Sequence, residues 1–179
     1  VIELALAEAI YVGILTDTGS FRFSSTSQKT HRIAADLLSK GVKPNEIHGR
    51  VYDSYSAERL RLLGYALNDG LKLYADDQLA IISLDAETLK RYQFKRGDTE
   101  GLVNYPLSIK SVKVSILLSE KDKKIKMSFR SKGDLAVNGF ARDHFDGGGH
   151  INAAGGISSL GMQATLDKLE GLVDQLLKP

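Results

Sequence analysis

Residues 146–156 of the chain read DGGGHINAAGG, with five glycines and two alanines in eleven positions. Because glycine has no side chain and tolerates a positive φ, such a segment lets the backbone turn its N–H groups toward one point. N–H donors grouped in this way bind anions. The composition is equally typical of a plain turn, and it matches neither the P-loop nor the dinucleotide-binding fingerprint. The residues alone therefore leave a phosphate site and a simple turn as open alternatives.

Polar side chains in and before this segment favour the phosphate site. His150 and Asn152 lie within it, and both can donate hydrogen bonds. Arg130-Ser131 ends the preceding strand pattern, and a guanidinium presents a planar fork that suits a phosphate. The competing interpretation is that His150 is structural or solvated, as a lone histidine often is, and we assign His144 to that class.

The hydrophobic pattern around the segment predicts helices first and then strands alternating with helices. Four helices are expected before residue 70, at 4–15, about 28–40, 44–53 and 57–68, with Leu60, Leu63 and Leu67 on one face of the last. A short extended piece is expected at 21–23. Strands are expected at 71–75, 79–84, 111–119, 124–130 and near 155–159, and later helices at 85–92, 135–145 and 163–177.

This order of elements predicts the α/β class. The interpretation is a fragment of one α/β domain at 1–53, a linker helix at 54–70, and a complete small α/β domain at 71–179. The small domain should contain a mixed sheet of about five strands.

Composition limits the classes of function. The 179 residues are 42% hydrophobic and 26% charged, which allows a sizeable core. The net charge is only +2, so a phosphate partner needs a local site rather than a global basic field. The absence of cysteine excludes disulfides and zinc thiolate sites and fits a cytoplasmic protein. The apolar start contains Glu3 and Glu8, which argues against a signal peptide or a membrane segment.

The motif GGGH at 147–150, with AAG at 153–155 and RSK at 130–132, resembles the DHH-associated C-terminal domain of DHH-family phosphoesterases. The resemblance covers roughly residues 70–179. It implies that 71–179 is a substrate-binding domain in which the loop histidine, the loop backbone and the strand arginine hold the phosphate and the nucleotide. The implied substrate-binding residues are Arg130, Ser131, Gly147, Gly148, Gly149, His150 and Asn152.

A second motif lies where the first predicted helix ends, at Thr16-Asp17-Thr18-Gly19. An aspartate there can cap a turn, or it can ligate a cation such as Mn²⁺. The DTG triplet of aspartic proteases belongs on a β hairpin, and the helix-rich context argues against it. GILTDTGSFRF at 13–23 is similar to the last metal-binding motif of DHH-family enzymes.

That similarity implies that Asp17 is a catalytic metal ligand in a two-manganese site, and that 1–53 is the C-terminal remnant of a DHH catalytic domain. The other metal-binding motifs, including Asp-His-His itself, do not occur in the chain. We therefore expect them to precede Val1, and we expect the chain alone to be inactive.

The compact spacing between the two motifs resembles most the bacterial nanoRNases within this family. The implied function is metal-dependent hydrolysis of short oligoribonucleotides and/or 3′-phosphoadenosine 5′-phosphate. RecJ-like single-strand exonucleases and cyclic-dinucleotide phosphodiesterases are alternatives within the family. A non-catalytic nucleic-acid-binding module is an alternative from another class. The expected partner is short RNA or a nucleotide, and a homodimer stays an open option.

Overall fold

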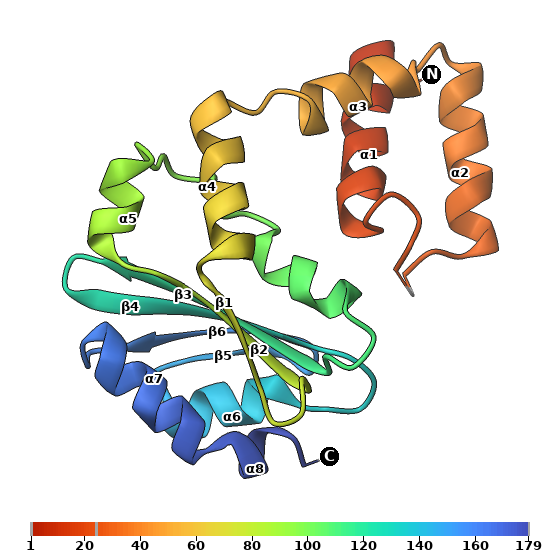
Figure 1. The fold of residues 1–179 in the computed structure, drawn as a ribbon. Helices are drawn as coiled ribbons and strands as arrows, with labels where there is room; N and C mark the ends of the chain where they lie inside the picture. The colour runs from red at the N-terminus through yellow and green to blue at the C-terminus, as the bar shows by residue number, and fades with distance from the viewer. Residues whose placement is uncertain (1, 24, 179) are drawn as a thin grey trace. The chain divides into compact units, whose positions relative to one another are not determined.

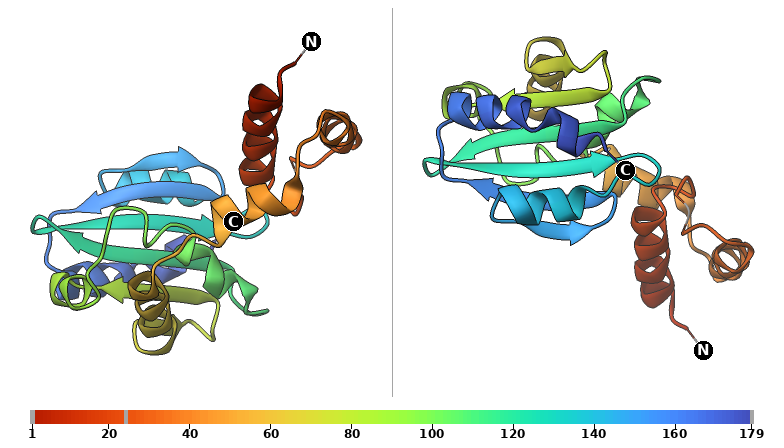
Figure 2. Two further views of the ribbon diagram at one scale, coloured as in Figure 1. Left: turned by 90° about the horizontal axis from the view of Figure 1, so that it is seen from above. Right: turned by 90° about the horizontal axis from the view of Figure 1, so that it is seen from below.

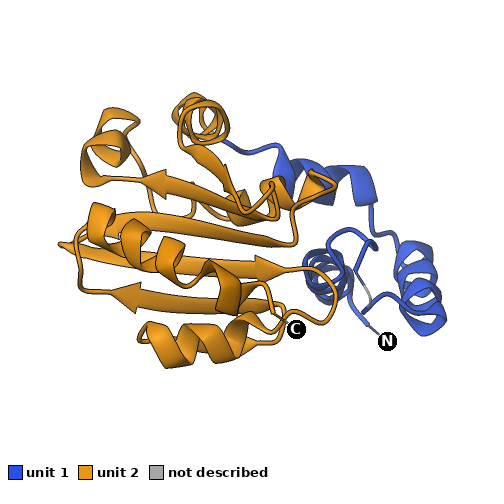
Figure 3. Cartoon of the chain, turned by 60° about the horizontal axis from the view of Figure 1, so that its bottom comes forward, with its two compact units in different colours: residues 1–55 blue, residues 56–179 orange. Residues whose placement is uncertain are grey.

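The computed structural model describes residues 2–23 and 25–178. Residues 1, 24 and 179, which include the first residue of the predicted range 1–53 and the last of 71–179, lie outside the described residues. The chain divides into two compact units, Val1–Tyr55 and Ser56–Pro179, called here unit 1 and unit 2 (Figure 3). Each unit is described separately.

The described residues of unit 1 form three helices, α1 (Leu4–Asp17), α2 (Gln28–Ser39) and α3 (Pro44–Tyr52). The side chain of Ser27 accepts a hydrogen bond from the Thr30 backbone, and Thr30 returns one to the Ser27 backbone, so α2 begins with a capping box. Gly41, with a φ of 95°, follows the end of α2, where glycine commonly ends a helix. The buried hydrophobic core described in this unit consists of Ala7, Tyr11, Leu15, Ala34, Leu37, Val42 and Ile47.

The predicted extended piece at 21–23 is wrong. Phe21 has a φ of 66°, and the backbone N–H groups of Arg22 and Phe23 both donate to the Thr18 carbonyl at 2.9 Å. The Phe21 N–H donates to the Thr18 hydroxyl at 3.0 Å. These bonds fold the segment into a turn at the end of α1. An apolar-polar-apolar pattern over three residues is too short to distinguish a strand from such a turn.

Unit 2 is built on a six-stranded mixed sheet with the order β1-β2-β3-β4-β6-β5. Among the strand pairs of the described residues, β2–β3 is parallel and the other four are antiparallel. The α/β class is confirmed, and the sheet has one strand more than predicted because the glycine segment itself forms β5. The strands are β1 (Leu71–Tyr74), β2 (Leu79–Leu84), β3 (Val114–Lys121), β4 (Lys124–Ser131), β5 (Gly148–His150) and β6 (Ala153–Ser158).

Helices cover both faces of this sheet (Figures 1 and 2). Helices α6 (Val137–His144), α7 (Met162–Gly171) and α8 (Val173–Leu176) pack on one face. On the other lie α4 (Ala57–Asn68), α5 (Ala86–Arg91) and the 3-10 helix η1 (Leu102–Ser108). The sequence did not predict η1, and it predicted α7 and α8 as one helix.

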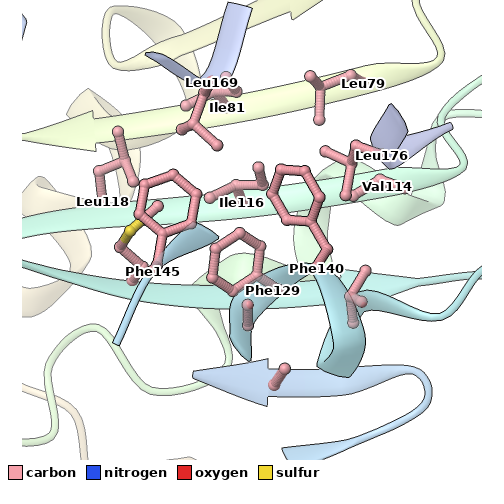
Figure 4. Close-up of a cluster of buried hydrophobic side chains, with 14 of the residues drawn as sticks. Leu79, Ile81, Val114, Ile116, Leu118, Phe129, Phe140, Phe145, Leu169 and Leu176 are labelled. Carbon is pink, nitrogen blue, oxygen red and sulfur yellow. The ribbon is translucent and has the colours of Figure 1, made fainter. Parts of the chain in front are cut away.

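The core under α6, α7 and α8 contains three phenylalanines (Figure 4). The ring of Phe129 on β4 lies 6.1 Å from that of Phe140 and 6.0 Å from that of Phe145. These rings join the alternate side chains of β3 and β4, such as Ile116 and Leu118, that point to this face.

The core on the other face is formed by Leu62, Ala66, Ile82, Leu84, Leu89, Leu102, Val103 and Leu117. Leu60, predicted on the apolar face of α4, is 55% exposed, because α4 turns Leu62 and Ala66 toward the sheet instead. None of the helices in the described residues has both the length and the hydropathy needed to cross a bilayer.

Candidate functional site

The glycine segment is a β hairpin rather than a loop. Gly148 pairs with Gly155 and His150 with Ala153, so Ile151 and Asn152 form the turn between β5 and β6. Within residues 146–156 only Gly149 has a positive φ, of 145°. The nest of inward-turned N–H groups suggested by the composition is therefore absent from this described segment, because the backbone continues the sheet.

Two of the three glycines are needed for close backbone approach. A Cβ at Gly147 would lie 2.2 Å from the carbonyl oxygen of Gly155, and one at Gly149 would lie 2.5 Å from that of Ala153. A Cβ at Gly148 would meet nothing within 4 Å. Gly147 and Gly149 thus let the hairpin close, whereas Gly148 leaves open space above the strand.

The sheet brings Arg130 and His150 to one face. Arg130 on β4 pairs with Ala153 on β6, which pairs in turn with His150 on β5. Paired residues of antiparallel strands point to the same face. With about 5 Å between paired Cα atoms, Arg130 and His150 are about 10 Å apart across Ala153. The neighbouring row consists of Ser128, Gly155 and Gly148.

This face opposes the phenylalanine core, so α6, α7 and α8 do not cover it. The helices on this face, α4, α5 and η1, lie over the β1–β2–β3–β4 side, and none of them stands over β6 and β5 in the described part of unit 2 (Figure 2, left). His150 is exposed, while Ala153 and Gly148 are partly buried. Two glycines and an alanine thus leave a floor without large side chains between Arg130 and His150.

Arg130 is a partly buried cation with unused donors. Burial lowers the pKa of its guanidinium, because a low dielectric disfavours the charged form. Its Nη1 donates to the Phe129 carbonyl at 2.9 Å. Over the described residues it makes no ion pair with a carboxylate. A guanidinium has five N–H donors, so most of them are free for an anionic ligand.

Ser131 and Asn152 brace the connection that follows β4. The Asn152 amide donates to the Ser131 hydroxyl at 2.9 Å and to the Gly133 carbonyl at 2.8 Å. Ser131, only 8% exposed, donates to the Leu135 carbonyl at 2.6 Å. These bonds fix the tip of the hairpin against the end of β4 and so hold His150 relative to Arg130.

Sequence reasoning missed other polar residues that bond to the hairpin or share the open face with Arg130. Asn138 on α6 donates to the Gly149 carbonyl at 3.4 Å. Lys126 and Ser128 precede Arg130 on β4 and line a cavity of about 1030 Å³ beside α5. The alternation of Lys126, Ser128 and Arg130 with the buried Ile125, Met127 and Phe129 was the available signal.

Asp17 is the last residue of α1, in unit 1, and its side chain is exposed. The described residues contain no group of three or more His, Asp or Glu side chains that could hold a metal ion. One exposed carboxylate does not fit a two-metal centre by itself. The described residues thus do not form such a centre by themselves.

Unit 2 is thus an α/β domain whose mixed sheet carries Arg130 and His150 on one open face. The family model described as the DHHA1 domain matches residues 77–178, and the chain therefore belongs to the DHHA1 domain family, as its GGGH motif indicated.

Similar proteins agree with this family. The chain is 30% identical to the bifunctional oligoribonuclease and PAP phosphatase NrnA of Bacillus subtilis, over 83% of this chain and 46% of that protein. It is 33% identical to the Thermus thermophilus protein of the same name, over 84% and 44%. Among solved structures, an exopolyphosphatase-related protein from Bacteroides fragilis matches with a TM-score of 0.93 and 41% identity, over 97% of this chain and 51% of that one. The chain spans about half the length of these relatives.

Proposed function

We propose that this chain is the substrate-gripping part of a metal-dependent phosphoesterase that hydrolyses short oligoribonucleotides and/or 3′-phosphoadenosine 5′-phosphate. The observation that carries the proposal is the row Arg130–Ala153–His150, which places two donors on one open face of the sheet. The relatives named as oligoribonuclease and PAP phosphatase support the substrate class.

In this proposal Arg130 and His150 donate hydrogen bonds to a phosphate of the substrate. The charged guanidinium lies in a partly buried position, where its bonds to a phosphate are stronger than in water. Gly148 leaves room above the floor for the sugar or the base. Ser131 and Asn152 hold His150 in position relative to Arg130, because their polar side-chain atoms form hydrogen bonds within the protein.

We further propose that Asp17 is one ligand of a divalent metal, Mn²⁺ by the chemistry of the motif. The other ligands would come from residues outside this chain, since the described residues form no metal-binding group. Such a metal pair supplies an activated water and neutralises charge on the phosphoryl oxygens. In the same proposal 1–53 is the end of the catalytic domain, 54–70 the linker, and 71–179 the substrate-binding domain.

The grip is tested by binding. The dissociation constant of the chain for a diribonucleotide is measured by calorimetry for the parent, Arg130→Ala and His150→Ala. Hydrogen bonds to charged groups contribute about 1.5–3 kcal/mol, so each variant should bind at least about tenfold more weakly. Lys72→Ala, a change of one exposed lysine on β1, is the control and should bind normally. Unchanged binding in both site variants would remove the proposed grip.

The division of labour is tested by activity. The chain alone, with Mn²⁺, should release no mononucleotide from a diribonucleotide, because its described residues form no metal-binding group. Chromatography of the products after prolonged incubation measures this. Turnover by the isolated chain would mean that the assignment of the chemistry to residues outside it is wrong.

A further inference from the structure

A cavity of about 1030 Å³ lies on the same sheet face as Arg130, beside α5. Its walls are α5, the segment 93–99, and the hairpin ends of β3 and β4. All of these belong to unit 2. Nothing in the proposed grip at Arg130 and His150 uses this space.

The lining of the cavity is basic. Five of its side chains are cations and two are carboxylates, which gives it a net charge of +3, whereas the whole chain carries only +2. One carboxylate, Glu120, accepts a hydrogen bond from the Ala86 backbone at 3.1 Å. In the described part of the chain none of the five cations forms an ion pair. The cations are Lys90, Lys95, Arg96, Lys121 and Lys126.

Strand β4 connects this cavity with the proposed grip. Lys126, Ser128 and Arg130 alternate along β4 and point to one face, since successive residues of a strand point to opposite faces. At about 3.3 Å per residue, Ser128 lies about 7 Å and Lys126 about 13 Å from Arg130. Donors therefore follow one another along a line on the open face.

The cavity also has an apolar wall, formed by Leu89, Phe94 and Leu117. Surfaces that hold single-stranded nucleic acid combine cations along the backbone with aromatic or apolar groups against the bases. A site for free phosphate would not need the apolar wall.

We propose that the cavity beside α5 holds the downstream nucleotides of a single-stranded oligoribonucleotide whose end is gripped by Arg130 and His150. The inference rests on the proposed function and adds a site for the nucleotides that follow the gripped one. Lys126 and Arg96 bind the following phosphates, and Phe94 contacts a base.

The test compares two ligand lengths at several salt concentrations. Dissociation constants for a diribonucleotide and a hexaribonucleotide are measured by calorimetry for the parent chain and for the double variant Lys126→Gln/Arg96→Gln. The matched control is Lys72→Gln, which removes an exposed lysine that does not line the cavity.

The parent should bind the hexanucleotide more tightly than the dinucleotide. The double variant should weaken hexanucleotide binding by about three- to tenfold, as expected for two exposed ion pairs, and leave dinucleotide binding unchanged. Its plot of log K against log salt for the hexanucleotide should become less steep by about 1.4, because each phosphate contact with a single strand contributes about 0.7.

Equal affinities for both lengths in the parent, or an unchanged salt slope in the double variant, would overturn the inference. Inorganic tripolyphosphate distinguishes a free anion from a nucleic acid. If the double variant loses only tripolyphosphate binding, the cavity holds free anions and the inference is wrong. The proposed function fails separately, when Arg130→Ala and His150→Ala leave dinucleotide binding unchanged.

Discussion

Replacing Gly147 by alanine should destabilise unit 2, whereas the same change at Gly148 should not. Neither residue has a positive φ, so alanine fits the backbone at both positions. At Gly147 the new Cβ would lie 2.2 Å from the Gly155 carbonyl oxygen and 2.8 Å from the Gly156 Cα. Both are backbone atoms, and they can move only if the ladder between β5 and β6 is disturbed.

Overpacking costs about 1–3 kcal/mol, and each backbone hydrogen bond lost adds about 0.5–1.5 kcal/mol. Gly147→Ala should therefore lower the free energy of unfolding by about 3 kcal/mol. A Cβ at position 148 would meet nothing within 4 Å. Gly148→Ala should therefore raise the free energy of unfolding by about 0.5 kcal/mol, because alanine lowers the entropy of the unfolded chain.

Urea denaturation followed by circular dichroism measures both values in the 179-residue chain. The difference between the two neighbouring positions, about 3–4 kcal/mol, is the quantity of interest. Equal stabilities within about 0.5 kcal/mol would refute the close packing of β5 against β6.

Phe129 has no exposed surface, so Phe129→Ala should lower the free energy of unfolding by about 3–5 kcal/mol. Leu60 is exposed, so Leu60→Ala should lower it by less than about 0.5 kcal/mol, and urea denaturation compares the two variants. Ser27→Ala removes the capping box of α2 and should lower the free energy of unfolding by about 1 kcal/mol. A decrease as small as that of Leu60→Ala would contradict a stabilising role for this cap. Burial raises the pKa of Tyr11, so the stability it contributes is complete below the unfolded pKa near 10 and is lost as the pH rises through the folded value. Denaturation between about pH 8 and pH 11 should show this loss, and Tyr11→Phe should remove it.

The periodic elements of the fold were predictable from the sequence. The helices predicted at about 28–40 and 85–92 form close to those positions as α2 and α5, and β2 spans the predicted residues 79–84. The secondary-structure predictions were wrong where local hydrogen bonds, and not the hydrophobic pattern, determine the backbone conformation. Thr18 turns residues 21–23 away from an extended form, and η1 has no hydrophobic period long enough to predict.

Composition suggested an anion site at the glycine segment but misjudged its geometry. Glycines were interpreted as freedom to turn, whereas Gly147 and Gly149 serve to let β5 approach β6. That pairing, and the register that aligns Arg130 with His150, depend on strands far apart in sequence. The cavity residues Lys126 and Arg96 were missed because they meet only after the crossover from β2 to β3.

The sheet ends in short strands on both sides, β1 with four residues and β5 with three, beside central strands of eight. A strand at an edge exposes unpaired N–H and C=O groups that can recruit another chain. So short an edge offers few of these groups, and Lys72 on β1 adds a charge that disfavours stacking of a second sheet. The glycine-rich β5 thus also limits aggregation, because the low strand propensity of glycine keeps this edge strand short and leaves few unpaired backbone groups for another chain to pair with.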